Sequence, residues 1–245
     1  MDTLEQTYLW RPAKYKETYL VYLLTQLSGK KIIIFASTCN QTLKLALLLR
    51  FLNFKAVNIN GKLSQQQRLN ALNRFKSNER NILIATDVAS RGLDIPSVDV
   101  VVNFDIPGNS KDYIHRVGRT ARAGRTGKAI TFVTQYDVVI FQKIETLIGR
   151  KLEEYPCENK HALILYDSVC EAQRQAAIEM RDSKYLKEDE NEAKDDAEND
   201  PNADMFKKRT HKNSHNSHSK GFGGGNLGPK SFARKRKRVS WKENI

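Results

Sequence analysis

Short apolar runs without polar alternation recur along the first two thirds of the chain. Ile32 to Ala36, Ile82 to Ala85 and Val100 to Val102 are rich in β-branched residues and carry no charged side chain. Such runs are typical of strands covered on both faces of a sheet. We expect further strands at residues 4–10 (edge-like), 56–59 and 129–133.

Helical spacing of apolar residues separates these runs. Ser64 is placed to cap a helix whose Leu69, Leu72 and Phe75 are expected on one face. Strands that alternate with helices predict a parallel α/β sheet with helices on both faces, whose ligands bind at the carboxyl ends of the strands. The other predicted helices span residues 14–27, 40–53, 110–119 and 137–148.

Composition adds a class of partner to this fold. The 245 residues carry 41 Lys and Arg against 28 Asp and Glu, a formal charge of +13, and this excess favours a polyanion such as nucleic acid. No apolar run is long enough to span a membrane, and the first residues do not resemble a secretory signal. Cys39, Cys157 and Cys170 form neither a disulfide framework nor a zinc ribbon, so we expect a reducing compartment and no metal ligands.

Charge divides the C-terminal part of the chain into two blocks. Residues 182–204 carry ten acids and three lysines, and residues 205–245 carry twelve bases and one acid, so residues 1–181 keep +9 of the total. High charge and low hydrophobicity predict disorder for both blocks. The predicted domains are a linker or first strand (1–13), the α/β domain (14–165), a helical extension (166–181), the acidic segment (182–204) and the basic tail (205–245).

The basic tail contains three candidate motifs, and we assign a function to only one of them. Gly223, Gly225 and Gly228 match a dinucleotide fingerprint but lack a preceding strand and a following helix. Nothing around the tail histidines would hold them in the geometry of a metal site. A basic run predicts recognition by a nuclear import receptor, with RNA phosphates as the other ligand that it could bind. The run consists of Arg234, Lys235, Arg236, Lys237 and Arg238.

Chemically informative residues follow the predicted strands. The run Thr86 to Asp94 comes after one strand, Asn103 to Pro107 after another, and His115 to Arg125 lies further on. The last run holds four arginines, and three of them recur at every third residue, so that they face broadly one way on a helix. So many like charges indicate a bound anion, either a triphosphate or an RNA backbone. These three arginines are Arg116, Arg119 and Arg122.

These motifs resemble those of a known family. The stretch Ile34 to Thr38, the pair Gln65 and Arg68, and the runs Thr86 to Asp94 and His115 to Arg122 occur in the order and spacing of the C-terminal RecA-like domain of DEAD-box RNA helicases. The resemblance covers about residues 4 to 165. The sequences of Ser110 to Ile114 and of Phe141 to Leu152 are similar to those of the nuclear subgroup that acts in ribosomal RNA processing.

The resemblance implies an ATP site and an RNA site, each shared with a second RecA-like domain. Arg119 and Arg122 resemble the arginines that reach the γ-phosphate, and His115 resembles the residue that couples this run to the other domain. Asp94 resembles the carboxylate that accepts a ribose hydroxyl, beside Arg91 and Gly92 in the turn. The residues that resemble RNA-backbone contacts without base identity are Ser37, Thr38, Gly61, Arg68 and Thr86.

Two motifs of such an enzyme do not occur in this sequence. There is no G-x-x-x-x-G-K-[ST] and no Asp-Glu-Ala-Asp, so the phosphate-binding lysine and the carboxylate that organises Mg²⁺ are expected upstream of Met1. A fragment, a partial gene model and a natural short product are all compatible with this. The main hypothesis is the C-terminal half of an ATP-dependent RNA helicase, inactive alone, which acts with ATP and Mg²⁺ in pre-ribosomal particles of the nucleus or nucleolus. The alternative is an RNA-binding or regulatory fragment without catalysis. An oxidoreductase is disfavoured because no glycine fingerprint lies in a strand–helix turn.

Overall fold

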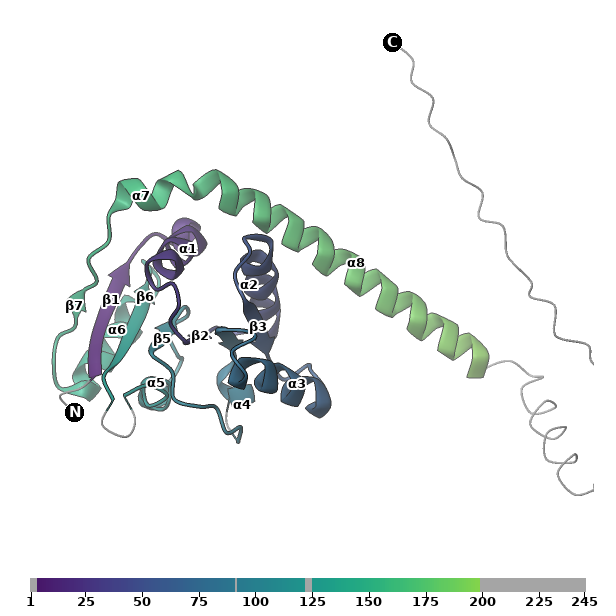
Figure 1. Cartoon of the computed structure of the whole chain (residues 1–245), viewed down its shortest axis with the longest axis horizontal. Helices are drawn as coiled ribbons and strands as arrows, with labels where there is room; N and C mark the ends of the chain where they lie inside the picture. Colours follow the sequence, from purple (N-terminus) through teal and green to yellow (C-terminus); the bar gives the residue numbers. More distant parts are fainter. Residues whose placement is uncertain (1–3, 91, 122–124, 199–245) are drawn as a thin grey trace, which may run out of the picture. The chain divides into compact units, whose positions relative to one another are not determined.

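Seven parallel strands form one sheet in the described part of the chain. The computed structural model describes residues 4–90, 92–121 and 125–198, with side chains as far as residue 182. The chain divides into two units, residues 1–189 and 190–245, and the sheet belongs to the first. The strand order is β3-β4-β2-β5-β6-β1-β7 (Figure 1). The strands are β1 (Leu4–Trp10), β2 (Ile32–Phe35), β3 (Ala56–Ile59), β4 (Ile82–Ala85), β5 (Val100–Asn103), β6 (Gly127–Val133) and β7 (Glu153–Glu154).

Helices connect the strands and cover both faces of the sheet. One face packs against α1, α2, α7 and the first turns of α8, and the other packs against α3, α4, α5 and α6. The predicted parallel α/β architecture is therefore confirmed. The helices are η1 (Ala13–Tyr15), α1 (Lys16–Gln26), α2 (Cys39–Phe51), α3 (Gln65–Lys76), α4 (Asp87–Ser90), α5 (Ser110–Val117), α6 (Val138–Ile148), α7 (Asn159–Ile164) and α8 (Tyr166–Glu198).

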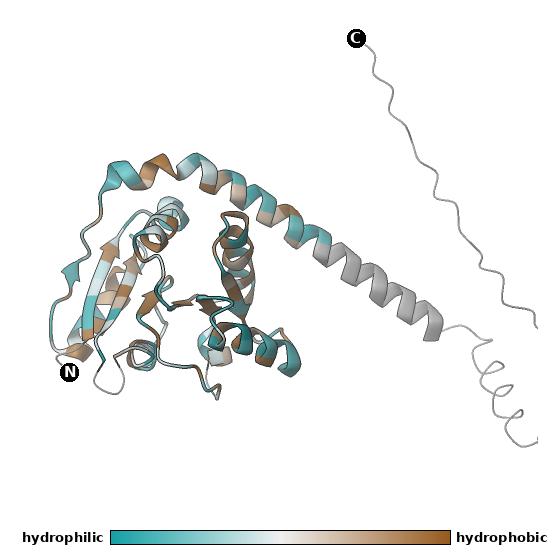
Figure 2. Ribbon diagram, in the orientation of Figure 1, coloured by the Kyte–Doolittle hydropathy of each residue, from teal (hydrophilic) through white to brown (hydrophobic). Residues whose placement is uncertain are grey.

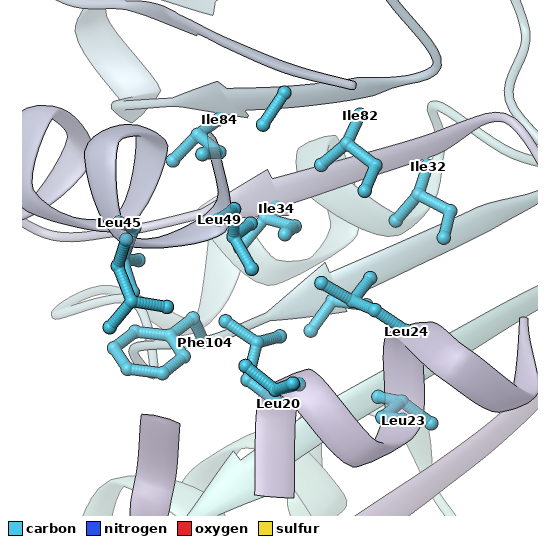
Figure 3. Packing of buried hydrophobic residues seen from close by; sticks show 14 of the residues in the cluster. Leu20, Leu23, Leu24, Ile32, Ile34, Leu45, Leu49, Ile82, Ile84 and Phe104 are labelled. Carbon is cyan, nitrogen blue, oxygen red and sulfur yellow. The ribbon is translucent and has the colours of Figure 1, made fainter. Parts of the chain in front are cut away.

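The apolar strands divide their side chains between two cores. In β2, Ile32 and Ile34 belong to the core under α1 and α2, whereas Ile33 and Phe35 belong to the core over α3 and α5. Figure 3 shows how Leu20 and Leu24 of α1 lie near these strands in the first core. Burial of each such side chain contributes about 1.5–3 kcal/mol, so the central strands anchor the whole sheet. Many residues of α2 and of the central strands are hydrophobic, whereas α3 is largely hydrophilic (Figure 2).

The structure corrects several expectations in detail. Leu69 is 40% exposed, and the buried face of α3 is formed by Ala71, Leu72 and Phe75 instead. The first strand, β1, is not the outermost one, because the two-residue strand β7 pairs with its outer side at Thr7 and Tyr8.

The α8 backbone continues past the predicted extension to Glu198, and the proposed domain boundaries stay predictions. No helix of the described residues is long and apolar enough to cross a bilayer.

Candidate functional site

The register of the sheet brings the ends of four strands to the same level. Phe35 of β2 pairs with Ala85 of β4 and with Asn103 of β5, and Ala85 also pairs with Ile59 of β3. The residues that follow these ends therefore lie side by side at the carboxyl edge of the sheet. We call the predicted RNA-contact residues that follow these ends, together with Arg68 of α3, the strand-end rim: Ser37, Thr38, Gly61, Arg68 and Thr86.

Internal hydrogen bonds hold two loops of the strand-end rim. Thr38 caps α2, because its hydroxyl accepts a hydrogen bond from the backbone N–H of Gln41 at 3.1 Å. Asn60 is buried and donates from Nδ2 to Thr42 Oγ1 at 3.0 Å, while its Oδ1 accepts from the backbone N–H of Lys62 at 3.0 Å. The backbone around Gly61 is thus fixed before any ligand arrives.

Gly61 is not required by the packing of the protein itself. A Cβ atom built at this position meets no atom within 4 Å, and the residue is exposed. The glycine therefore leaves open space beside the backbone at the strand-end rim, where a ligand could approach closely.

Arg68 lies in the second turn of α3. Ser64 and Gln67 form a capping box at the start of this helix, as the sequence predicts for Ser64. The Nε atom of Arg68 is buried and has no hydrogen-bond partner among the described residues. The same is true of Arg11 and Arg80, so this feature alone does not distinguish Arg68.

A buried layer of polar groups lies behind the strand-end rim, with Arg116 at its centre. Arg116 is only 2% exposed, and its Nε and Nη2 donate to the two carboxylate oxygens of Asp87 at 2.6 and 2.7 Å. Its Nη1 donates to the backbone carbonyl of Asp105 at 2.6 Å and lies 3.4 Å from Asn103 Oδ1. The guanidinium also lies over the Phe35 ring. Every edge of this cation is therefore engaged inside the protein.

Asp105 extends this layer to the strand-end rim. One of its carboxylate oxygens accepts from the backbone N–H of Ser37 at 2.9 Å, and the other pairs with Lys16 Nζ at 2.6 Å. Asn103 is fully buried and donates to Thr131 Oγ1 at 3.0 Å. We call Asp87, Asn103, Asp105 and Arg116 the buried polar layer. It joins α5 to α4 and to the loops that follow β2 and β5.

The prediction that Arg116 and Arg119 share one helix face is wrong, because the helix is shorter than predicted. Helix α5 ends at Val117, with Gly118 as its C-cap, so Arg119 lies beyond the helix and does not share its periodicity. Arg116 faces Asp87 rather than an external anion. Arg119 is half-buried, and its carbonyl accepts a hydrogen bond from the backbone N–H of Val98 at 3.1 Å.

Tyr113 ties α5 to the first strand. Its hydroxyl donates to Gln6 Oε1 at 2.9 Å. Burial raises the pKa of Tyr113 to about 12, although a hydrogen bond with Thr131 acts in the opposite direction. The hydroxyl therefore stays protonated at neutral pH and serves as a permanent donor that holds the helix in place.

Two residues predicted to act at the ATP site, His115 and Asp94, have exposed side chains. His115 is exposed on α5, with Nδ1 3.7 Å from Asp112 Oδ1, and it lines a small hollow together with Ser90 and Arg119. The Asp94 side chain is 92% exposed and pairs with Lys76 Nζ at 2.8 Å. An exposed pair of this kind contributes at most about 1 kcal/mol, so a ligand could displace it.

Of the predicted site residues not yet located, the structure places Gly92 alone. Gly92 lies in the turn after α4 with a positive φ of 74°. Arg91 and Arg122 lie outside the described residues, as does the basic run 234–238. No group of His, Cys, Asp or Glu within the described ranges could hold a metal ion.

Sequence reasoning gave no role to the residues that hold the site together, although Asn103 and Asp105 lie in a run that it singled out. Asn60 directly follows β3, Asn103 is the last residue of β5, and both are buried. An amide at the end of an apolar run must be hydrogen-bonded when buried, which was the available signal. Asp105 and Lys16 come from segments far apart in the chain, so no local pattern could pair them.

The fold and this site define a class, the RecA-like helicase domain. Residues 15–124 match the family described as the helicase conserved C-terminal domain. The crystal structure of the E. coli DEAD-box protein SrmB bound to regulator of ribonuclease activity A contains a similar chain, with a TM-score of 0.60 at 35% identity and with 63% of this chain and 91% of that chain covered. The chain belongs to the DEAD-box RNA helicases, as a C-terminal RecA-like domain.

Relatives of the ribosomal-RNA-processing subgroup share most of the folded sequence. "Probable ATP-dependent RNA helicase DDX47" of Mus musculus is 61% identical over 182 residues, which are 74% of this chain and 40% of that protein. "ATP-dependent rRNA helicase rrp3" of Schizosaccharomyces pombe is 58% identical over 182 residues, 74% of this chain and 39% of that protein. The chain thus spans about two fifths of the length of the curated relatives it matches.

Proposed function

We propose that this chain acts as the C-terminal half of an ATP-dependent RNA helicase. The observation that carries the proposal is the bidentate pair between Arg116 and Asp87. Asp87 directly follows Thr86 of the strand-end rim, and Arg116 lies three residues before Arg119. One buried contact therefore connects the predicted RNA residues with the predicted phosphate residues.

The strand-end rim supplies the RNA contacts in this proposal. A hydroxyl or a backbone N–H can bind a phosphate or sugar oxygen, and neither group reads the edge of a base. The open space at Gly61 permits the close approach that a backbone-to-backbone contact needs. Binding should therefore be nearly independent of base sequence.

Arg119 and Arg122 supply charge to the phosphates of ATP. A guanidinium fork suits phosphate oxygens, and phosphoryl transfer is helped mainly by positioning and neutralisation of charge. Bound ATP with Mg²⁺ supplies the transferable phosphoryl group. Asp94, beside Gly92 and Arg91, would accept the ribose hydroxyl, and His115 would face the N-terminal RecA-like domain. Arg116 cannot take part, because its donors are already used.

The biological role that we propose is pre-rRNA processing and ribosome biogenesis. It is supported by the names of the relatives, which include an rRNA helicase. The basic run Arg234 to Arg238 would direct the protein to the nucleus and nucleolus. Pre-ribosomal particles would then be the place where RNA is remodelled.

An ATPase assay of a fusion protein tests the proposal. We expect the chain fused behind the N-terminal RecA-like domain of the mouse relative to hydrolyse ATP in an RNA-stimulated manner. Arg119→Ala and Arg122→Ala should abolish hydrolysis with the fold unchanged, whereas Lys111→Ala on exposed α5 surface should not. Active arginine variants would disprove the assignment. A fusion that binds RNA but never hydrolyses ATP would support the alternative, a regulatory RNA-binding fragment.

A further inference from the structure

An apolar groove lies between α5, α6 and the start of β1. It encloses about 580 Å³, a size typical of sites that take several side chains or a small ligand. Ile114 on α5 is 40% exposed and Leu147 on α6 is 46% exposed. Apolar side chains gathered in one hollow are a mark of an interaction site, whereas scattered ones are not. The lining of the groove includes Leu4, Ile114, Val117, Leu147, Ile148 and Arg150.

The walls of this groove are held in place by internal contacts. Tyr113 on α5 donates a hydrogen bond to Gln6 of β1, a residue that also lines the groove. Behind the α5 wall, the Thr120 hydroxyl donates to the backbone carbonyl of Val98 at 2.6 Å. A Cβ at Gly127 would lie 2.5 Å from the backbone N of Ala121, so β6 packs directly against this turn. These contacts hold the backbone of the groove walls in place.

The charge of the groove indicates what it binds. Among the described lining residues the single charged one is Arg150, which is exposed and has no ion pair within the described part of the chain. RNA affinity comes from many cations at once, and one arginine in an apolar hollow does not supply them. An apolar protein segment with one carboxylate complements both the walls and the charge.

We propose that the groove between α5 and α6 docks a protein segment that places apolar side chains between Ile114 and Leu147 and a carboxylate against Arg150. The docking does not depend on helicase activity. The groove is also lined by Gly118, Thr120 and Ala121, on either side of Arg119. A docked partner would therefore contact the turn that carries a predicted phosphate-binding arginine.

Peptide binding to the whole chain tests this proposal. The probes are two matched pools of short labelled peptides, in which two leucines one helical turn apart are followed by either glutamate or lysine. We expect the glutamate pool to bind about threefold more tightly, as one exposed charge pair allows. Arg150→Glu should reverse the preference. Leu147→Asp should weaken binding at least about tenfold, the effect of losing an apolar anchor.

Controls separate this groove from other surfaces. Ile164→Asp, at a 74% exposed position of α7, should leave peptide binding unchanged. Because Leu147 and Arg150 are exposed, both variants should fold, and circular dichroism checks this. Equal binding of both pools with no effect of Arg150→Glu would overturn the proposal. So would loss of RNA binding in Leu147→Asp, or loss of peptide binding when the N-terminal RecA-like domain is fused in cis.

Discussion

The buried polar layer and the strand-end rim each contain an arginine and lie near the same edge of the sheet, but they serve different ends. Arg116 in the layer uses its donors on Asp87, Asn103 and Asp105, all inside the protein. In the rim, Ser37 and Gly61 are exposed, and neighbouring groups hold the backbone at or beside them. Thr38 is also exposed but uses its hydroxyl to cap α2, and Thr86 is only 6% exposed. A polar residue near the sheet end is thus structural when its partners are internal, and it is available to a ligand when only its backbone is fixed.

Removal of Arg116 is the strongest test of this contrast. Arg116→Ala leaves the Asp87 carboxylate partly buried without its partner, so we expect a loss of about 3–5 kcal/mol in the free energy of unfolding. Lys111→Ala, on the exposed side of the same helix, should change stability by less than about 0.5 kcal/mol. Urea denaturation followed by circular dichroism measures both. A loss below about 1 kcal/mol for Arg116→Ala would break the contrast.

Removal of the tail should show how much RNA affinity the rim provides. Residues 205–245 hold twelve bases and one acid, so we expect truncation after residue 181 to weaken RNA binding and flatten its salt dependence. The slope for single strands is about −0.7 per phosphate contacted. Thr86→Ala and Arg68→Ala should then matter more in the truncated chain. Equal slopes for whole and truncated chains would show that the tail does not contribute.

Two glycines provide a matched pair within the exposed surface. A Cβ at Gly61 or at Gly108 meets no atom within 4 Å, so alanine at either position should change stability by less than about 1 kcal/mol. Only Gly61 belongs to the strand-end rim. We expect Gly61→Ala to weaken RNA binding by about threefold to tenfold, within the range that one lost contact produces. Gly108→Ala should leave RNA binding unchanged, and equal effects would remove Gly61 from the site.

The smallest expected effect concerns a carboxylate outside both regions. Burial would raise the pKa of Glu145, but hydrogen bonds from Lys151 Nζ at 2.7 Å and from the backbone N–H of Leu152 at 2.9 Å hold it below its ordinary value. Its stabilisation is therefore present above the unfolded pKa of about 4.3 and is lost as pH falls through the lower folded value.

The matching experiment measures stability against pH. Glu145→Gln should reduce the loss of stability on acidification below about pH 4.3, because the variant has no proton to bind there. Glu179→Gln, at an exposed position of α8, serves as the control. An unchanged acid limb in Glu145→Gln would show that this carboxylate does not contribute to the pH dependence.

Much of the fold could be predicted because its strands are buried on both faces. The runs at β2, β4 and β5 carry no polar alternation, and they lie where a parallel sheet needs them. The short elements α4, β7 and α7 were not predicted, because a few residues show no period. The orientation of α3 was also misjudged at Leu69, since a helix with few apolar residues fits more than one face.

The sequence by itself determined the class of fold, the family and the candidate residues, because strand burial, motif order and spacing are local properties of the chain. Only the tertiary structure decided which of these residues face outward. Arg116 and Arg119 are alike in sequence, but α5 ends between them. The partners of Arg116 come from α4, β5 and the loop after β5, which lie outside its own helix, and a buried guanidinium stays where those partners satisfy its donors.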